Sequence, residues 1–362
     1  MGRVVRRDTI FNLSTMTRRW VALVVVLVLV VGVGAFLIPS HNSPNSSNYW
    51  SFRHIDRRGN LNSVSCPTSS FCMAVSNSFE FTFSGGSWSK GLRINPETGL
   101  LDDLSSVSCA SENFCVAVGG GYEVTYSGGN WSSRLIDRNS TPQLTSVSCP
   151  SSTFCMAVGT EYGDGDAFKY SDGTWSGGQQ IDRSDSLTSV SCPNSAFCVA
   201  VNGFGDEFTF SNGKWSEFAG MDHNVFSNEI GSQEGLTSVS CPSSRFCVTV
   251  DDAGYEFTYT NGSWSHGKEV DGVTNANTNN NLVGVSCANT RFCVTVPQFA
   301  QSEIIYSGHR WSKLQPVGPN SGPNWGFSSV SCPQSAFCVA TSLDGGDIFT
   351  YPVRSGSKPD ST

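Results

Sequence analysis

Charged residues are scarce in this chain. Only 14% of its residues are Asp, Glu, Lys or Arg, whereas 37 of the 362 residues are Gly. A chain with little charge and much Gly, Ser and Asn is expected to form short strands joined by turns rather than long helices. The formal net charge is −8 for the whole chain and −12 after residue 38, where 29 acidic and 17 basic residues lie. This argues against nucleic acid and anionic lipid as partners of that part.

The familiar catalytic motifs are also missing. The sequence contains no Gly-x-Ser-x-Gly, no His-Glu-x-x-His and no phosphate-binding loop, so it carries no sequence sign of an α/β-hydrolase, a zincin or a P-loop enzyme. It has five histidines, and they do not follow any repeating pattern. We therefore expect no metal and no cofactor.

No cysteine is left over as a spare thiol. Seven pairs with the spacing Cys-x5-Cys account for all 14 cysteines, and each pair lies in one repeat that reads Leu-x-Ser-Val-Ser-Cys-Pro-x-x-x-Phe-Cys-x-Ala-Val. The pairs are Cys66 and Cys72, Cys109 and Cys115, Cys149 and Cys155, Cys192 and Cys198, Cys241 and Cys247, Cys287 and Cys293, and Cys332 and Cys338. Successive repeats begin 40 to 49 residues apart, which is the length of a four-stranded propeller blade.

The third repeat illustrates the expected strands. Residues 144–149 alternate as a strand does, residues 154–158 form a second strand after a turn, and a loop at 159–165 leads to a third strand at 167–170. A tight turn then precedes a fourth strand that opens at Trp175. Four short antiparallel strands per repeat make one blade.

The ends of the repeat array predict how the ring closes. A Trp marks the fourth strand of six repeats, and these residues are Trp88, Trp131, Trp175, Trp215, Trp264 and Trp311. The seventh repeat stops after its third strand at Tyr351, and the missing Trp occurs before the first repeat, at Trp50. The sequence therefore predicts an all-β, seven-bladed β-propeller over residues 49–351, with an N-terminal strand that closes the last blade.

The N-terminal region predicts one transmembrane helix before the propeller. Residues 20–38 form an unbroken apolar run that follows five arginines, long enough to cross the hydrocarbon core with the N-terminus in the cytoplasm. We expect a cytoplasmic tail at 1–19, a signal anchor at 20–39, a polar tether at 40–48 and a disordered C-terminal tail at 352–362. A cleaved signal peptide is the alternative.

Export would place the cysteines in an oxidising compartment, where disulfides persist. Seven local disulfides are then the simplest interpretation of the seven pairs. Zinc is the alternative, but zinc pairs usually have a shorter spacing and need partner ligands.

The repeat resembles a known family. Val-Ser-Cys-Pro-x-x-x-Phe-Cys-x-Ala-Val-Gly, followed by Tyr-Ser-x-Gly-x-Trp, resembles the blade of sialidase-type (BNR, Asp-box) propellers, and within them the photosystem II assembly-factor group. It is also similar to the repeat of uncharacterised exported bacterial proteins. The resemblance implies the fold over residues 49–351 and leaves the function open. The turn Ser171-Asp-Gly-Thr-Trp175 is shorter than an Asp box.

Three recurring polar sets are candidates for chemistry. Ile-Asp-Arg recurs at 55–57, 136–138 and 181–183, and we interpret it as part of the blade rather than as a catalytic arginine cluster. Five glutamates (Glu80, Glu123, Glu207, Glu256 and Glu303) recur three residues before the third-strand aromatic. We interpret them as a repeated hydrogen bond or a solvated position rather than a cation-gathering ring. Asp164 with Asp166, and Asp344 with Asp347, would give calcium an incomplete shell.

Loop lengths indicate where a partner would bind. The segment from the leading Leu to the Trp varies from 27 to 31 residues, whereas the connection from the Trp to the next repeat varies from 11 to 21. Binding usually occurs on variable loops over a rigid scaffold. We therefore predict a contact surface on the connections at 217–235 and 269–281, with Trp325 as a further candidate in the connection at 313–326. The candidates in the first connection are Asp222, His223, Phe226, Asn228 and Glu229. Trp325 could equally cap a neighbouring blade.

These observations predict a monomeric, membrane-anchored, extracytoplasmic propeller in the cell envelope that binds or scaffolds a protein or glycan without catalysis. A sialidase-like carbohydrate-active enzyme and a purely structural envelope protein are the alternatives.

Overall fold

We describe a computed structural model of the chain. The described residues are 50–57, 59–94, 104–137, 140–218, 220–221, 235–270, 281–299, 301–317, 326–343 and 345–351. Within these ranges every regular element is a β-strand, and no helix has the length and apolar character needed to span a bilayer. The predicted anchor at 20–38 and the tails lie outside the described residues.

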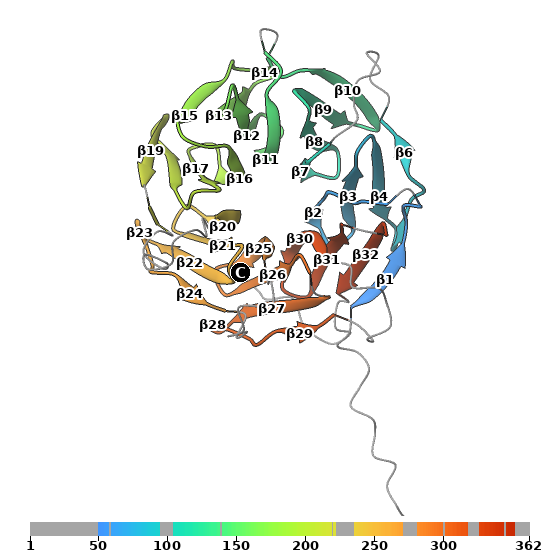
Figure 1. Cartoon of the computed structure of the whole chain (residues 1–362). Helices are drawn as coiled ribbons and strands as arrows, with labels where there is room; N and C mark the ends of the chain where they lie inside the picture. The colour runs from blue at the N-terminus through green and yellow to red at the C-terminus, as the bar shows by residue number, and fades with distance from the viewer. Residues whose placement is uncertain are drawn as a thin grey trace, which may run out of the picture. The chain divides into compact units, whose positions relative to one another are not determined.

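Seven antiparallel sheets, each one blade, are arranged in a ring (Figure 1). Blade 1 contains β2 (Ser63–Thr68), β3 (Phe71–Ser76), β4 (Phe79–Ser84), β5 (Ser87–Trp88) and β6 (Leu92–Arg93). Blade 2 contains β7 (Ser106–Ser111), β8 (Phe114–Gly119), β9 (Tyr122–Ser127) and β10 (Asn130–Leu135). Blade 3 contains β11 (Gln143–Ser151), β12 (Phe154–Glu161), β13 (Asp164–Ser171), β14 (Thr174–Trp175) and β15 (Gln179–Asp182).

The remaining blades repeat this order. Blade 4 contains β16 (Leu187–Asn194), β17 (Phe197–Asn202), β18 (Glu207–Ser211) and β19 (Lys214–Phe218). Blade 5 contains β20 (Leu236–Ser243), β21 (Phe246–Asp251), β22 (Tyr255–Thr260), β23 (Ser263–Trp264) and β24 (Lys268–Glu269). Blade 6 contains β25 (Leu282–Asn289), β26 (Phe292–Pro297), β27 (Ser302–Ser307), β28 (Arg310–Trp311) and β29 (Gln315–Pro316). Blade 7 contains β30 (Phe327–Gln334), β31 (Phe337–Ser342), β32 (Asp347–Tyr351) and β1 (Ser51–His54).

The N-terminal strand closes the ring, as the sequence predicted. Strand β1 pairs antiparallel with β32, with Ser51 opposite Thr350 and His54 opposite Asp347. The Trp50 ring lies 5.6 Å from that of Tyr351, centroid to centroid. Because β1 covers the outer edge of β32, detaching the N-terminal segment from blade 7 would expose the edge of that sheet.

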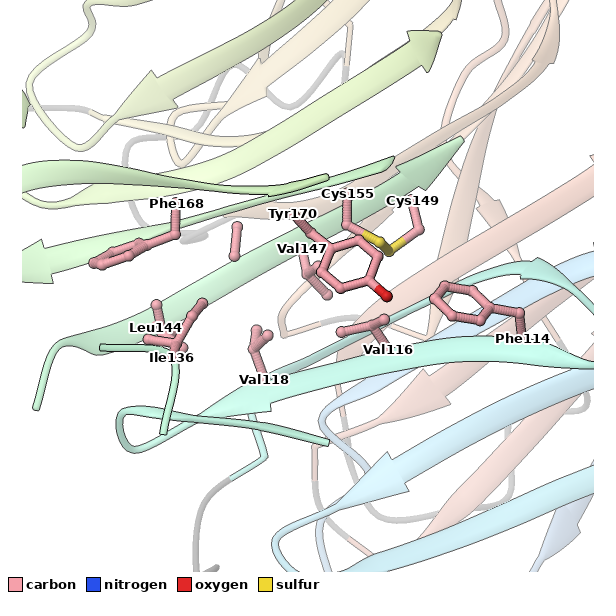
Figure 2. Close-up of a cluster of buried hydrophobic side chains, with 11 residues drawn as sticks. Phe114, Val116, Val118, Ile136, Leu144, Val147, Cys149, Cys155, Phe168 and Tyr170 are labelled. Atoms are coloured by element: carbon pink, nitrogen blue, oxygen red, sulfur yellow. A yellow bond between two sulfur atoms is a disulfide. The ribbon is translucent and has the colours of Figure 1, made fainter. Parts of the chain in front are cut away.

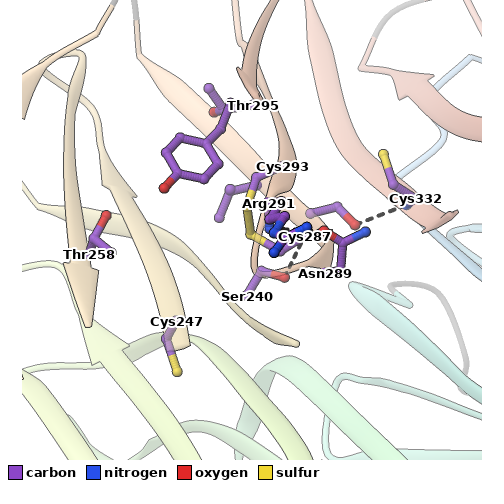
Figure 3. Close-up of a disulfide and its surroundings, with 12 residues drawn as sticks. Ser240, Cys247, Thr258, Cys287, Asn289, Arg291, Cys293, Thr295 and Cys332 are labelled. Carbon is purple, nitrogen blue, oxygen red and sulfur yellow. Dashed lines mark hydrogen bonds between the residues drawn. A yellow bond between two sulfur atoms is a disulfide. The ribbon is translucent and has the colours of Figure 1, made fainter. Parts of the chain in front are cut away.

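Two serines of the repeat join neighbouring blades at the inner strands. In the Ser-Val-Ser-Cys segment each serine hydroxyl accepts a hydrogen bond from a backbone N–H of the next blade, as Ser63 does from Val107 at 3.2 Å and Ser65 from Cys109 at 2.9 Å. Figure 3 shows the equivalent bond from Cys287 to Ser240. The innermost strand has no neighbour within its own sheet on that side, so these serines satisfy donors that would otherwise lack a partner.

Thirteen of these bonds join the first strands of neighbouring blades around the ring. Seven blade boundaries with two positions each would give fourteen. The missing one falls between blades 6 and 7, where Gly284 replaces the first serine and offers Val330 no hydroxyl.

The apolar core lies between blades rather than within them. One cluster combines Phe114, Val116 and Val118 of blade 2 with Val147 and Phe168 of blade 3 (Figure 2). Each of the other six clusters likewise draws on two neighbouring blades. Packing between blades therefore depends on every blade being in place.

Each repeat contains one local disulfide between its first and second strands, as the cysteine spacing predicted. The zinc alternative is wrong for this structure, because each sulfur bonds to the other cysteine of its repeat. The bond between Cys149 and Cys155 lies in the cluster between blades 2 and 3, so the disulfide occupies apolar space at a blade boundary (Figure 2). The seven bonds join Cys66 to Cys72, Cys109 to Cys115, Cys149 to Cys155, Cys192 to Cys198, Cys241 to Cys247, Cys287 to Cys293 and Cys332 to Cys338.

Strand bounds differ from the sequence-based prediction in two respects. The loop expected at 159–165 is a two-residue hairpin turn, because Tyr162 and Gly163 both adopt positive φ (53° and 96°), the conformation that the twist of paired strands favours. The fourth strand is interrupted in blades 1, 3, 5 and 6, where its two pieces both pair with the third strand. Sequence periodicity could not show either feature, because both depend on local turn geometry.

Candidate functional site

The predicted contact residues in the long connections lie outside the described part of the chain. This applies to Asp222, His223, Phe226, Asn228 and Glu229, and to Trp325. The residues that lead into three of the connections are described, and Met221, Val270 and Val317 are buried in the blade cores. The connections therefore start from fixed points of the scaffold.

The five recurring glutamates form a repeated contact between blades. All five are buried, with 2–6% of their surface exposed. In blade 7, the Trp50 indole N–H donates to Glu303 Oε2 at 2.9 Å. In the other four cases the indole of the following blade lowers the pKa of the carboxyl group, although its nitrogen is not within hydrogen-bond geometry. These pairs are Glu80 with Trp131, Glu123 with Trp175, Glu207 with Trp264 and Glu256 with Trp311.

A threonine two residues later completes this arrangement in four blades. Thr82, Thr125 and Thr258 donate to Glu80, Glu123 and Glu256 at 2.7 Å, and Thr209 donates to Glu207. The interpretation of these glutamates as a repeated hydrogen bond is thus confirmed. The alternative of a solvated position is wrong, because the next blade covers the third strand.

Burial makes these carboxyl groups hard to ionise. Loss of water raises the pKa of all five glutamates, and that of Glu207 and Glu303 to about 7. The threonine hydroxyls and the neighbouring indoles oppose the rise, and Arg134 also lowers the pKa of Glu123. Desolvation exceeds the donors' effect because one or two hydrogen bonds do not replace a hydration shell.

Two blades lack the glutamate. Blade 7 has Ile348 at this position, 1% exposed and packed in one cluster with Trp88 of blade 1. Blade 3 has Ala167, which faces Trp215 of blade 4. At that boundary a cavity of about 260 Å³ remains, and it is lined by Met156, Ala167, Lys169, Ser176, Gly177, Gln179, Phe210, Gly213 and Trp215. The sequence shows a break in the glutamate series at Ala167, but nothing in it indicates a cavity at this position.

The Ile-Asp-Arg segments support the blades, as interpreted from the sequence. Asp56 is buried and accepts a hydrogen bond from Ser76 at 2.9 Å, and Asp182 accepts one from Asn202 at 2.7 Å. The eight described arginines are exposed. Arg53, Arg93, Arg134 and Arg310 lie on the outermost strands of four different blades.

The acidic turn of blade 3 is compact but does not form a metal centre. The pKa of Asp166 is raised to about 6, chiefly by burial and in part by the nearby charges of Glu161 and Asp164. Within the described ranges, no group of three or more His, Cys, Asp or Glu residues is arranged to hold a metal ion. Asp347 is hydrogen-bonded to His54 at 3.2 Å, and Asp344 lies outside the described residues.

Comparison with known proteins supports the fold. No family model matches the chain, and no curated protein matches it. Among solved structures it is similar to YCF48 bound to D1 peptide, with a TM-score of 0.64 and 14% identity over 87% of this chain and 98% of that one. YCF48 from Cyanidioschyzon merolae gives a TM-score of 0.62 and 14% identity over 84% and 99% of the two chains.

A streptogramin B lyase structure has a TM-score of 0.62 and 10% identity, covering 83% of this chain and 97% of that one. At these identities the similarity shows a seven-bladed propeller fold alone. A lyase and a peptide-bound protein share it, so the fold by itself does not choose between catalysis and binding.

Proposed function

We propose that this protein is a non-catalytic binding or scaffolding module of the cell envelope, anchored in the membrane by residues 20–38. The observation that carries the proposal is the contrast between a fixed ring and variable connections. The ring is joined by thirteen serine-to-backbone hydrogen bonds. The connections between blades range from 11 to 21 residues.

The strand order brings the described ends of those connections to one end of each blade. Successive strands of a blade run antiparallel, so the connections leave the blade at the end that also carries the turns between second and third strands. A rigid ring with loops of different lengths on one face presents a surface that can be varied without loss of the fold. YCF48, which shares the fold, has been solved with a peptide bound, and this supports a protein segment as the partner.

Crosslinking of the full chain in intact envelopes, followed by affinity capture, tests the binding function. The variant replaces residues 222–234 with a Gly-Ser segment of equal length. The control alters the exposed turn at Glu112 and Asn113, which joins first and second strands at the opposite end of the blade. We expect one discrete partner that is lost in the variant and retained in the control. Capture of no partner, or turnover of a glycan by the wild type, would contradict the proposal.

The membrane anchor is tested separately. We expect the full chain to stay with the membrane after alkaline extraction and to keep its original N-terminus. Release into the soluble fraction, with a new N-terminus after residue 38, would show instead that the segment is a cleaved signal peptide.

A further inference from the structure

The boundary between blades 3 and 4 differs from the other boundaries at two paired positions. In blades 1, 2, 4 and 5 the third strand carries a buried Glu and, two residues later, a Thr that donates to it. In blade 3 these positions are Ala167 and Lys169. The carboxylate is missing, and a cationic side chain replaces its hydroxyl donor.

The resulting cavity has an apolar wall and a polar opening. Met156 and Phe210 line it from the core with 1% and 6% exposure, and the Trp215 ring packs on Phe210 at 5.3 Å. Lys169 lies on the exposed side. The volume of about 260 Å³ is below the ~300–1,000 Å³ of typical small-molecule sites. It suits one side chain better than a cofactor.

Other boundaries of the same ring show what fits there. At the boundary of blades 6 and 7 the equivalent tryptophan, Trp50, donates its indole N–H to the Glu303 carboxylate. At the boundary of blades 7 and 1 the bulky Ile348 occupies the position. Ala167 supplies neither a carboxylate nor bulk, so Trp215 and Lys169 line a cavity that no side chain of this boundary fills.

We infer that the cavity between blades 3 and 4 binds a carboxylate side chain from outside, an acidic residue of a peptide segment, in the position that Glu occupies in five other blades. The carboxylate would accept a hydrogen bond from the Trp215 indole and pair with the Lys169 amine, and its methylene groups would contact Met156 and Phe210. Charge-assisted hydrogen bonds are the strong ones in such a site. This site lies at a blade boundary rather than on the long connections, so it does not depend on the proposed function.

The test titrates the full chain in detergent micelles with capped tripeptides and observes the indole N–H signal of Trp215 by NMR. The Trp215→Phe variant assigns this signal among those of the nine tryptophans. Ac-Gly-Glu-Gly-NH2 is the probe, Ac-Gly-Gln-Gly-NH2 is its neutral control, and acetate represents a free small carboxylate. We expect the Glu peptide alone to shift the signal, with a Kd on the order of 1 mM for a single side chain.

Variants of the chain provide matched controls. Ala167→Glu supplies the missing carboxylate from inside and should weaken peptide binding at least about tenfold. Ala167→Ile copies Ile348 and should block the cavity by bulk alone, which keeps the test valid if the buried charge of Ala167→Glu is not tolerated. Lys169→Ala should weaken binding severalfold, whereas Lys214→Ala, on the adjacent outer strand β19 and outside the cavity lining, should not.

Some results would overturn the inference. These are no shift at Trp215 with the Glu peptide up to about 10 mM, equal shifts with the Gln peptide, or unchanged binding in both Ala167 variants. A shift with acetate but not with the peptide would assign the cavity to a free small acid instead. A converse result would support it: the double change Glu80→Ala with Thr82→Lys should create the same response at Trp131.

Discussion

The indole nitrogen of Trp50 lies 2.9 Å from Oε2 of Glu303, although 253 residues separate them in the chain. Trp50 belongs to the segment that completes blade 7, and Glu303 belongs to blade 6. One hydrogen bond thus connects the start of the propeller to its penultimate blade. The same residue also packs on Tyr351, the last residue of the final strand β32, so closure of the ring depends on Trp50 in two ways.

Replacement of Trp50 by Ala is expected to destabilise the propeller strongly. The side chain is 4% exposed and lies in the blade 6–7 cluster, and truncation of a buried Trp costs about 3–5 kcal/mol. The change would also leave Glu303 without its indole donor. Denaturant unfolding of the variant measures the cost. Phe52→Ala, at a 62% exposed position on β1, is the control, and equal losses for the two variants would contradict the role of Trp50 in closure.

Stability is expected to fall as the pH rises from about 5 to about 8. The pKa of Glu207 and that of Glu303 rise from 4.5 to about 7 on folding. Between these values the folded state holds protons that the unfolded state has released, so the stabilisation is complete below about 4.5 and is lost as the pH passes about 7. The raised pKa of Asp166, about 6, acts in the same direction.

Thermal unfolding across this pH range tests the prediction. Glu303→Gln keeps an acceptor for Trp50 but does not titrate, so it should flatten the pH dependence and be more stable than wild type at pH 8. Glu112→Gln, at an exposed turn position, should leave the profile unchanged. A wild-type profile that rises towards pH 8 would rule out the buried glutamates as the dominant titrating groups.

The sequence was sufficient for the fold because the repeat is regular. The Cys spacing gave the blade period, and the displaced Trp50 revealed how the ring closes. Both signals depend only on the positions of residues along the sequence. By contrast, the interruption of the fourth strand and the tight turn at Tyr162 depend on backbone dihedral angles that no spacing records.

The candidate site could be predicted only in part. The five glutamates stood out as a series, but their burial could not be inferred, because it depends on how closely the next blade packs. The cavity at Ala167 arises from a missing side chain, and an absence becomes visible only when the neighbouring Trp215 is placed against it. The residues predicted in the long connections lie outside the described residues and stay predictions.

Removal of one disulfide is expected to cost more than its short loop suggests. The chain-entropy model gives about 2–3 kcal/mol for such a loop. Cys149 and Cys155 also fill apolar space between blades 2 and 3, so Cys149→Ala with Cys155→Ala adds a cavity term. Denaturant unfolding measures the total, and peptide mapping without reductant of the wild type should find only the seven local links. Free thiols or links between repeats would contradict the pairing.

A substitution at Gly284 should increase the stability of the boundary between blades 6 and 7. Every other blade has at this position a serine whose hydroxyl accepts a hydrogen bond from the next blade, as Ser238 accepts one from Val285 at 3.1 Å. A Cβ added at Gly284 would lie 3.4 Å from the Val330 nitrogen and 3.5 Å from Val296, which is ordinary contact. Gly284→Ser should therefore restore the fourteenth hydrogen bond without strain and stabilise the domain by about 0.5–1.5 kcal/mol.

The reverse change at another boundary provides the matched control. Ser189 accepts from Val239 at 3.1 Å, so Ser189→Gly should destabilise the propeller by at least as much, because the Val239 N–H loses its partner and glycine adds flexibility to the unfolded chain. Gly284→Ala separates the two effects at the original site, since it stiffens the backbone without supplying an acceptor. If Gly284→Ser and Gly284→Ala stabilise equally in denaturant unfolding, the gain comes from backbone entropy and the serine hydroxyls do not hold the blades together.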